Sequence, residues 1–206
     1  MGLDVLTIRR CALFLILAGS VTLAACGGVA STEDLQGVVV DPPQPKPEFT
    51  LTDTSGNPYD FVSETEGKLT LLYFGYLNCP DICPVHLAQI AETFDRIPDV
   101  ARDAEVVFVS VDPERDSPEE IRAFLDSFDE RFVGLTGTLE EVESAQTATH
   151  GVNPAVFVGE GDDYTVNHAA QVIAFAPDGL SHSVYPFGVR QSQWNNDLQV
   201  LAELGS

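Results

Sequence analysis

Residues 69–84 read LTLLYFGYLNCPDICP and join three kinds of local structure in one short stretch. The opening run LTLLYF is continuously apolar, which is typical of a strand buried on both faces of a sheet. Cys79 and Cys83 follow it, and Pro84 favours the first turn of a helix. The stretch therefore predicts a buried strand, a cysteine-bearing loop and a helix. In α/β folds, sites gather at such carboxyl ends of strands.

The sequence around this stretch predicts the other elements of one domain. The turn at 55–58 separates two strand-like segments, and Pro177-Asp178-Gly179 marks a second hairpin. Ser117 followed by Pro118 and two acids is a helix start. Further strands are expected at 106–111 and 155–158, and further helices at 138–149 and 191–204. This order predicts an α/β, thioredoxin-like sandwich over residues 49–206, with a central mixed sheet flanked by helices.

The charge of the chain excludes one class of partner. Acidic residues number 32 against 10 basic ones, which gives a net charge of −22. Such a surface repels nucleic acid, so no nucleic-acid role is expected. It attracts cations and basic partner surfaces, although the same composition also suits a protein from a saline habitat.

The N-terminus has the pattern of an export signal. Arg9 and Arg10 precede an apolar stretch from Cys11 to Ala25 that is too short to span a membrane. The junction Leu-Ala-Ala-Cys ending at Cys26 resembles a bacterial lipobox. We expect residues 1–25 to be a signal peptide, cleaved before a lipidated Cys26, and the alternative is an ordinary signal peptide cut near Ala25.

Residues 26–48 are rich in proline and show little apolar periodicity. We expect this segment to be a semi-rigid tether between a lipid anchor and the domain. The predicted location is therefore extracytoplasmic, on the outer face of the cell membrane or in the periplasm.

Two thiols remain after export and lipidation, Cys79 and Cys83. Residues four apart on a helix share a face about 6 Å apart, which suits a disulfide or a metal held between two thiolates. A helix N-terminus also lowers thiol pKa values. Two thiolates with one or two imidazoles suit copper, whereas zinc would normally take a fourth protein ligand.

The residues leave the third ligand open between His86 and His168. His86 lies three residues after Cys83 and can share its helix face. His168 precedes an apolar strand, at a junction that the fold can bring over the cysteine loop. His150 lies near an expected helix end, and His182 lies beside a turn, where solvent exposure is expected.

Several motifs, in this order, resemble the Sco (SenC) family of copper chaperones for cytochrome c oxidase. The resemblance covers residues 47–204 and rests on the segments FGYLNCPDICP (74–84), VVFVSVDPERDSPE (106–119), RFVGLTGT (131–138), YTVNHAA (164–170) and APDG (176–179). It implies a thioredoxin fold and copper held by Cys79, Cys83 and His168, and it makes His86 a helix-surface residue. The implied partner is the oxidase subunit that carries a copper site.

One position departs from the family pattern. The family usually has aspartate directly before the histidine, and Asn167 stands there. A carboxylate beside a ligating imidazole raises its basicity and fixes its orientation. We therefore expect Asn167 to lower copper affinity or to change its pH dependence.

Two other activities are alternatives for the same cysteines. An exported thiol-disulfide reductase would use Cys79 and Cys83 as redox residues, but dedicated reductases of this fold usually carry Cys-x-x-Cys. A peroxidase would need one activated cysteine in a pocket supported by arginine and threonine, which this segment does not resemble.

The segment DPERD at 112–116 allows two interpretations of its role. Asp112, Glu114, Arg115 and Asp116 could dock a partner or handle protons. The simpler interpretation is a turn and helix cap, with Ser117 as the cap and Arg115 in a local ion pair.

Overall fold

The computed structural model describes residues 30–161 and 163–205. The strands are β1 (Val38–Pro45), β2 (Thr50–Asp53), β3 (Pro58–Asp60), β4 (Leu69–Gly75), β5 (Ala104–Ser110), β6 (Val133–Thr136), β7 (Val156–Glu160), β8 (Asp163–Asn167), β9 (Val172–Phe175) and β10 (Leu180–Tyr185). The helices are the 3-10 turn η1 (Thr32–Asp34), α1 (Phe61–Glu64), α2 (Ile82–Arg96), α3 (Pro98–Ala101), α4 (Pro118–Asp126), α5 (Leu139–Ala148) and α6 (Gln191–Glu203).

Eight strands form one mixed sheet in the order β1-β10-β9-β4-β5-β6-β2-β3. Strands β4, β5 and β6 run parallel, and β9 pairs antiparallel with β4. Every residue of β4 is buried, as its apolar run predicts. The thioredoxin-like architecture expected from the order of elements is confirmed.

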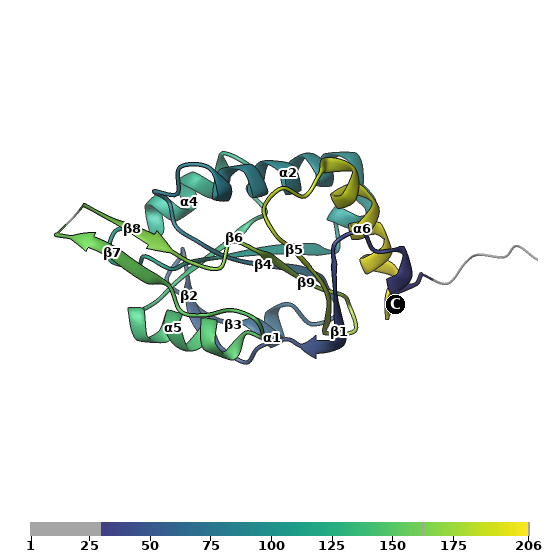
Figure 1. Cartoon of the computed structure of the whole chain (residues 1–206), viewed down its shortest axis with the longest axis horizontal. Helices are drawn as coiled ribbons and strands as arrows, with labels where there is room; N and C mark the ends of the chain where they lie inside the picture. Colours follow the sequence, from purple (N-terminus) through teal and green to yellow (C-terminus); the bar gives the residue numbers. More distant parts are fainter. Residues whose placement is uncertain (1–29, 162, 206) are drawn as a thin grey trace, which may run out of the picture.

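Alternate side chains of β4 enter two cores on opposite faces of the sheet. Leu71 and Tyr73 pack in the core built with α2, α4 and α6. Leu72 and Phe74 pack in the core built with α1 and α5. Figure 1 shows these two helix groups on either side of the sheet. The cysteine loop leaves the end of β4 between the two cores, so its position is fixed from both faces.

The tether expected over residues 26–48 is wrong for residues 38–45, which belong to the folded domain. Residues 38–45 form β1, which pairs antiparallel with β10 at one edge of the sheet. Prolines are tolerated there because an edge strand can leave some of its N–H positions unpaired. The Asp197 carboxylate accepts hydrogen bonds from the backbone N–H groups of Gln36 and Gly37, which attaches the chain before β1 to α6. The domain therefore begins before residue 49.

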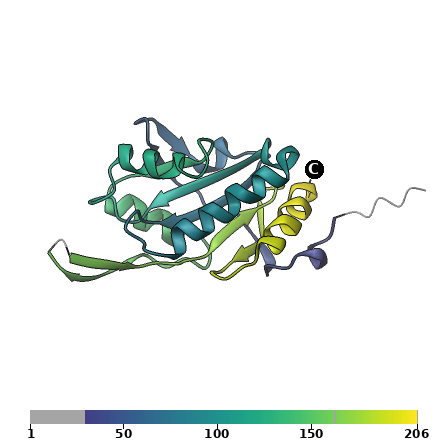
Figure 2. The same ribbon diagram turned by 90° about the horizontal axis from the view of Figure 1, so that it is seen from above.

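Strands β7 and β8 form a separate two-stranded sheet. The sequence indicated a strand near β7 but not β8. In Figures 1 and 2 this hairpin extends from the body at the end opposite η1. Its second strand, β8, ends at Asn167, directly before His168. The expected signal peptide and lipidated Cys26 lie outside the described residues. Among the residues described, no helix is both long and apolar enough to cross a membrane.

Candidate metal centre

The two cysteines lie where β4 ends and α2 begins. Cys83 is buried in the first turn of α2, and Cys79 is half-buried in the preceding loop. Both are free thiols, and the backbone N–H of Cys83 donates to the Sγ atom of Cys79 over 3.4 Å. This contact belongs to the helix N-terminus, where unpaired N–H groups favour thiolate.

His168 completes a cluster of three donor atoms. Its Nε2 atom lies 3.9 Å from the Sγ atom of Cys83. The donor atoms of Cys79, Cys83 and His168 all lie within 4.8 Å of one another. Two sulfurs bonded to one ion at about 2.3 Å each are at most about 4.6 Å apart, so the three donors are placed on the scale of a single metal ion.

The pKa values of the two thiols are shifted in opposite directions. A hydrogen bond from Cys83 lowers the pKa of Cys79 to about 5, against the opposing effect of burial. The same hydrogen bond, followed by burial, raises the pKa of Cys83 above its ordinary value. Both effects favour the negative charge on Cys79 and the remaining proton on Cys83. A soft cation that displaces this proton gains two thiolate ligands.

Two tyrosines pack around the cluster. The buried Tyr73 donates its hydroxyl hydrogen to the Sγ atom of Cys83 over 3.3 Å. The ring of Tyr76 meets the His168 ring edge to face, with centroids 5.5 Å apart. Tyr73 thus helps to fix the position of the Cys83 thiol, and Tyr76 helps to fix the His168 ring. Neither tyrosine was singled out from the sequence, although both lie in or beside the quoted cysteine segment.

Asn167 is exposed at the end of β8. The Nδ1 atom of His168 lies 3.0 Å from the backbone carbonyl oxygen of Ala169. With the proton on Nδ1 this contact is a hydrogen bond, and it leaves the Nε2 lone pair facing the sulfurs. The backbone thus provides an orienting contact of the kind expected from a carboxylate at position 167.

The other histidines lie outside the cluster. The surface position expected for His86 is wrong: the residue is fully buried, and Trp194 of α6, Tyr73 and Phe187 surround its ring. His182, expected in solvent, is 8% exposed and lies 2.7 Å from an Asp178 carboxylate oxygen.

His150 is exposed in the turn after α5. Of the two candidates that the sequence left open, the structure brings only His168 to the cysteines.

The loop between β5 and α4 contacts both the cysteine loop and strand β8, which precedes His168. Asp116 is buried and accepts hydrogen bonds from the backbone N–H of Leu77, in the cysteine loop, and from the Ser110 hydroxyl. Asp112 accepts a hydrogen bond from the hydroxyl of Tyr164 in β8 over 2.6 Å. Arg115 donates to the carbonyl oxygen of Tyr164 and lies 3.6 Å from the centre of its ring.

The expected cap and local ion pair are both present in this loop. Ser117 forms a capping box with Glu120, and Arg115 pairs with Asp112 at 2.5 Å. The structure adds that one loop positions both the cysteine segment and the strand that precedes His168. Sequence reasoning missed this because the partners Asp112 and Tyr164 lie far apart in the chain.

Removing the Tyr164 hydroxyl tests this positioning. We expect Tyr164→Phe to weaken metal binding at the cluster about tenfold or more while leaving the fold intact, because hydrogen bonds to buried charges contribute about 1.5–3 kcal/mol. Equilibrium metal titration of the reduced protein measures it. Tyr59→Phe is the matched control, since Tyr59 donates similarly to Glu105 at the other end of β5. Equal losses in both variants would contradict the positioning role.

The comparisons with known proteins agree with this geometry. The model of the SCO1/SenC family matches residues 40–203. The chain belongs to the SCO1/SenC family. The match begins inside β1, as expected if that strand is part of the domain.

Relatives of this SCO1/SenC protein cover most of its length. The Protein sco1 of Schizosaccharomyces pombe is 34% identical over 146 residues, which are 69% of this chain and 55% of that protein. The chain thus spans about half of that relative. Bradyrhizobium japonicum ScoI, solved with copper bound, is 33% identical with a TM-score of 0.67, covering 77% of this chain and 99% of that one. Apo Sco1 from Thermus thermophilus is 30% identical with a TM-score of 0.73, covering 85% and 99%.

Proposed function

We propose that this SCO1/SenC protein binds one copper ion through Cys79, Cys83 and His168 and delivers it to the copper site of a cytochrome c oxidase. The observation that carries the proposal is the convergence of two sulfurs and one imidazole nitrogen within 4.8 Å. These residues come from two segments separated by more than eighty positions of sequence. A structural disulfide would require neither the histidine nor its orientation.

The chemistry of the donors favours copper over zinc. Thiolates are soft ligands that select Cu(I), and the imidazole also suits Cu(II). Zinc in structural sites takes four protein ligands. Within the described part of the chain, the cluster comprises three such residues, without a fourth His, Cys, Asp or Glu. The copper-bound relative supports the same assignment.

The position of the site suits transfer to a partner. A surface pocket of about 250 Å³ borders it and is lined by Cys79, His168 and neighbours that include Tyr76, Asp81 and Ile82. Cys79 and His168 are half-buried, so an incoming ligand can reach them while Cys83 stays covered. The family resemblance supplies the oxidase as the receiving partner.

The reductase alternative is weaker on this geometry. The lowered pKa of Cys79 would serve a redox role. A dithiol reductase, however, does not need a histidine donor 3.9 Å from its buried thiol. We therefore place metal binding first.

We further propose that the chain is exported and held at the membrane by a lipid on Cys26. Support comes from the charged and apolar segments of residues 1–25 and from the lipobox-like junction. We expect Cys26→Ser to abolish incorporation of a labelled fatty acid into the protein, as measured by metabolic labelling and gel electrophoresis. Equal incorporation of the label into the variant and the wild type would contradict the anchor.

Anaerobic copper titration tests the metal site. We expect the reduced chain, with Cys26→Ser to remove the other thiol of the mature protein, to bind one copper ion tightly. His168→Ala should weaken binding by at least tenfold, because one of three ligands is lost. His150→Ala is the matched control, since that histidine is exposed and lies outside the cluster. Equal affinity of His168→Ala and the control would overturn the assignment.

A further inference from the structure

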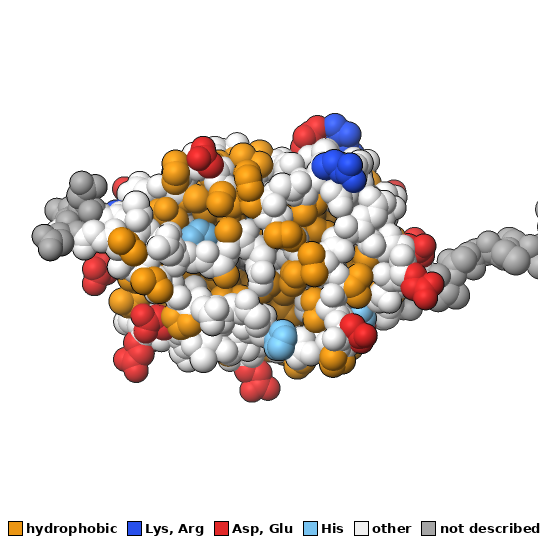
Figure 3. All heavy atoms as spheres, viewed as in Figure 1, with side chains coloured by type: hydrophobic (Ala, Val, Ile, Leu, Met, Phe, Trp, Pro, Cys, Tyr) orange, Lys and Arg blue, Asp and Glu red, His pale blue; other side chains and the backbone are white. Residues whose placement is uncertain are grey.

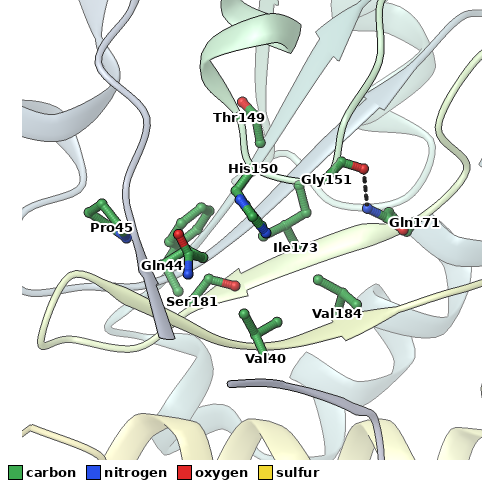
Figure 4. A pocket seen from close by; sticks show the side chains of 11 residues that line it. Val40, Gln44, Pro45, Thr149, His150, Gly151, Gln171, Ile173, Ser181 and Val184 are labelled. Atoms are coloured by element: carbon green, nitrogen blue, oxygen red, sulfur yellow. Dashed lines mark hydrogen bonds between the residues drawn. The ribbon is translucent and has the colours of Figure 1, made fainter. Parts of the chain in front are cut away.

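A second pocket, of about 250 Å³, lies away from the metal centre on the face of the sheet that carries α1 and α5. Figure 4 shows it between β1, β9, β10 and the turn after α5. The apolar part of its lining is Val40, Pro45, Ile173, Phe175 and Val184, and the polar part is Gln44, Thr149, His150, Gln171 and Ser181.

The local fold explains why this space is open. Between Val39 and Gln44 the pairing of β1 with β10 shifts register, so the edge strand departs from the sheet there. Helix α5 ends at Ala148, and the chain turns at Gly151 with φ near +75°. Strands β10 and β9, which lie next to the edge strand β1, are therefore not covered by α5 at this point.

One buried polar group in the lining lacks a protein partner. Ser181 is 3% exposed, and its hydroxyl has no hydrogen-bond partner among the described residues. In Figure 4 it lies between Val40 and the His150 ring, which points into the pocket. Gln171 and Gln44 differ, because their amide groups already donate to the carbonyl oxygens of Gly151 and Pro42. Buried polar groups are normally satisfied, so the Ser181 hydroxyl requires an explanation.

The lining is also unusual in charge. The whole chain carries a net charge of −22, yet no Asp, Glu, Lys or Arg lines this pocket. Figure 3 shows hydrophobic side chains across the middle of one face of the molecule, with acidic side chains at its margins. A mostly apolar pocket with a few convergent polar groups is the usual form of a small-molecule site.

We propose that this pocket binds a neutral ring compound that carries one hydroxyl or carbonyl group. An apolar cavity of about 150 Å³ is large enough for benzene, so this volume fits a substituted ring. The apolar walls would cover the ring, and the Ser181 hydroxyl would bond the polar substituent. A charged ligand is disfavoured because the lining contains no Asp, Glu, Lys or Arg side chain. The proposal is independent of copper and of the metal ligands.

Titration with 4-methylphenol tests the site on the full chain carrying Cys26→Ser, followed by amide NMR shifts. We expect saturable shifts confined to residues around the pocket, including Gly151, Gln171 and Ser181. Ser181→Ala should weaken binding about tenfold, whereas Ser183→Ala should not, since Ser183 is buried on the same strand but donates to the Val38 carbonyl. The anion 4-methylbenzoate should not bind.

A variant that fills the pocket gives a second test. Val184→Phe should abolish binding of 4-methylphenol if the ring occupies the space beside Val184. Shifts that do not saturate, that centre on the groove at Cys79, or that persist unchanged in both Ser181→Ala and Val184→Phe would overturn the proposal.

Discussion

Replacing His86 by leucine is expected to remove much of the acid sensitivity of folding between pH 6.5 and pH 4. Burial lowers the pKa of His86 from its ordinary value of 6.5 to about 4. Neither ring nitrogen has a hydrogen-bond partner among the described residues. The folded protein therefore keeps this imidazole neutral, while the unfolded chain takes up a proton below about pH 6.5.

The sign and size of the effect follow from this difference. Because the unfolded state binds the extra proton, stability falls as the pH drops from about 6.5, and the loss is complete below about pH 4. At about 1.4 kcal/mol per unit of pKa, the loss amounts to about 3 kcal/mol. Urea unfolding at a series of pH values measures it. At neutral pH His86→Leu should be at least as stable as the wild type, because it removes an unsatisfied buried polar group.

A matched control separates burial from loss of a histidine. His150→Leu removes an exposed imidazole and should leave the pH dependence unchanged. If His86→Leu kept the full acid sensitivity of the wild type, then His86 would be protonated in the folded protein or carry a partner. The buried environment described above would then be wrong.

Gly75→Ala is expected to have the second large effect, on both stability and the metal centre. A Cβ atom at this position would lie 2.6 Å from the ring of Phe108 and 3.1 Å from the Sγ atom of Cys83. Both neighbours are fully buried, so neither can move freely. Overpacking of this kind costs about 1–3 kcal/mol. We expect a lower free energy of unfolding and a weaker copper affinity, because Cys83 must shift.

Gly134→Ala is the control that separates a loss of stability from a loss of copper affinity. A Cβ atom there would lie 2.6 Å from Ile121 and 2.9 Å from Leu125, in the same sheet but away from the cysteines. It should destabilise the fold to a similar extent and leave copper affinity unchanged. In the Gly75→Ala background, Phe108→Leu should restore part of the stability. If Gly75→Ala bound copper with wild-type affinity, the added methyl group would not displace Cys83, and the expected effect on the metal centre would be wrong.

The local patterns of the chain were sufficient for the central part of the fold. The apolar run of β4 and the serine cap of α4 each depend on neighbouring residues, and each predicted the structure near its observed position. The Cys-x3-Cys spacing predicted two cysteines on one helix face, but α2 begins at Ile82 and Cys79 lies in the loop before it. The family resemblance singled out His168, which spacing alone could not separate from His86.

The errors arise where distant segments decide the environment. Proline content indicated a tether at β1, but pairing with β10 makes this segment an edge strand. His86 was expected at the surface of α2, but α6 covers that face and buries the ring against Trp194. The contact of Tyr164 with Asp112 joins residues that lie 52 positions apart. No periodicity within a single segment carries that information.

The three proposed ligands do not belong to one structural unit. Cys79 and Cys83 are attached to the main sheet through β4 and α2, whereas His168 follows β8 of the small separate sheet. An isolated two-stranded hairpin is only marginally stable, so β8 depends on its contacts with the β5–α4 loop. Small movements of the hairpin would withdraw the imidazole while both sulfurs stay in place. His168 is therefore the donor whose position depends on the hairpin, whereas the two sulfurs depend on the main sheet.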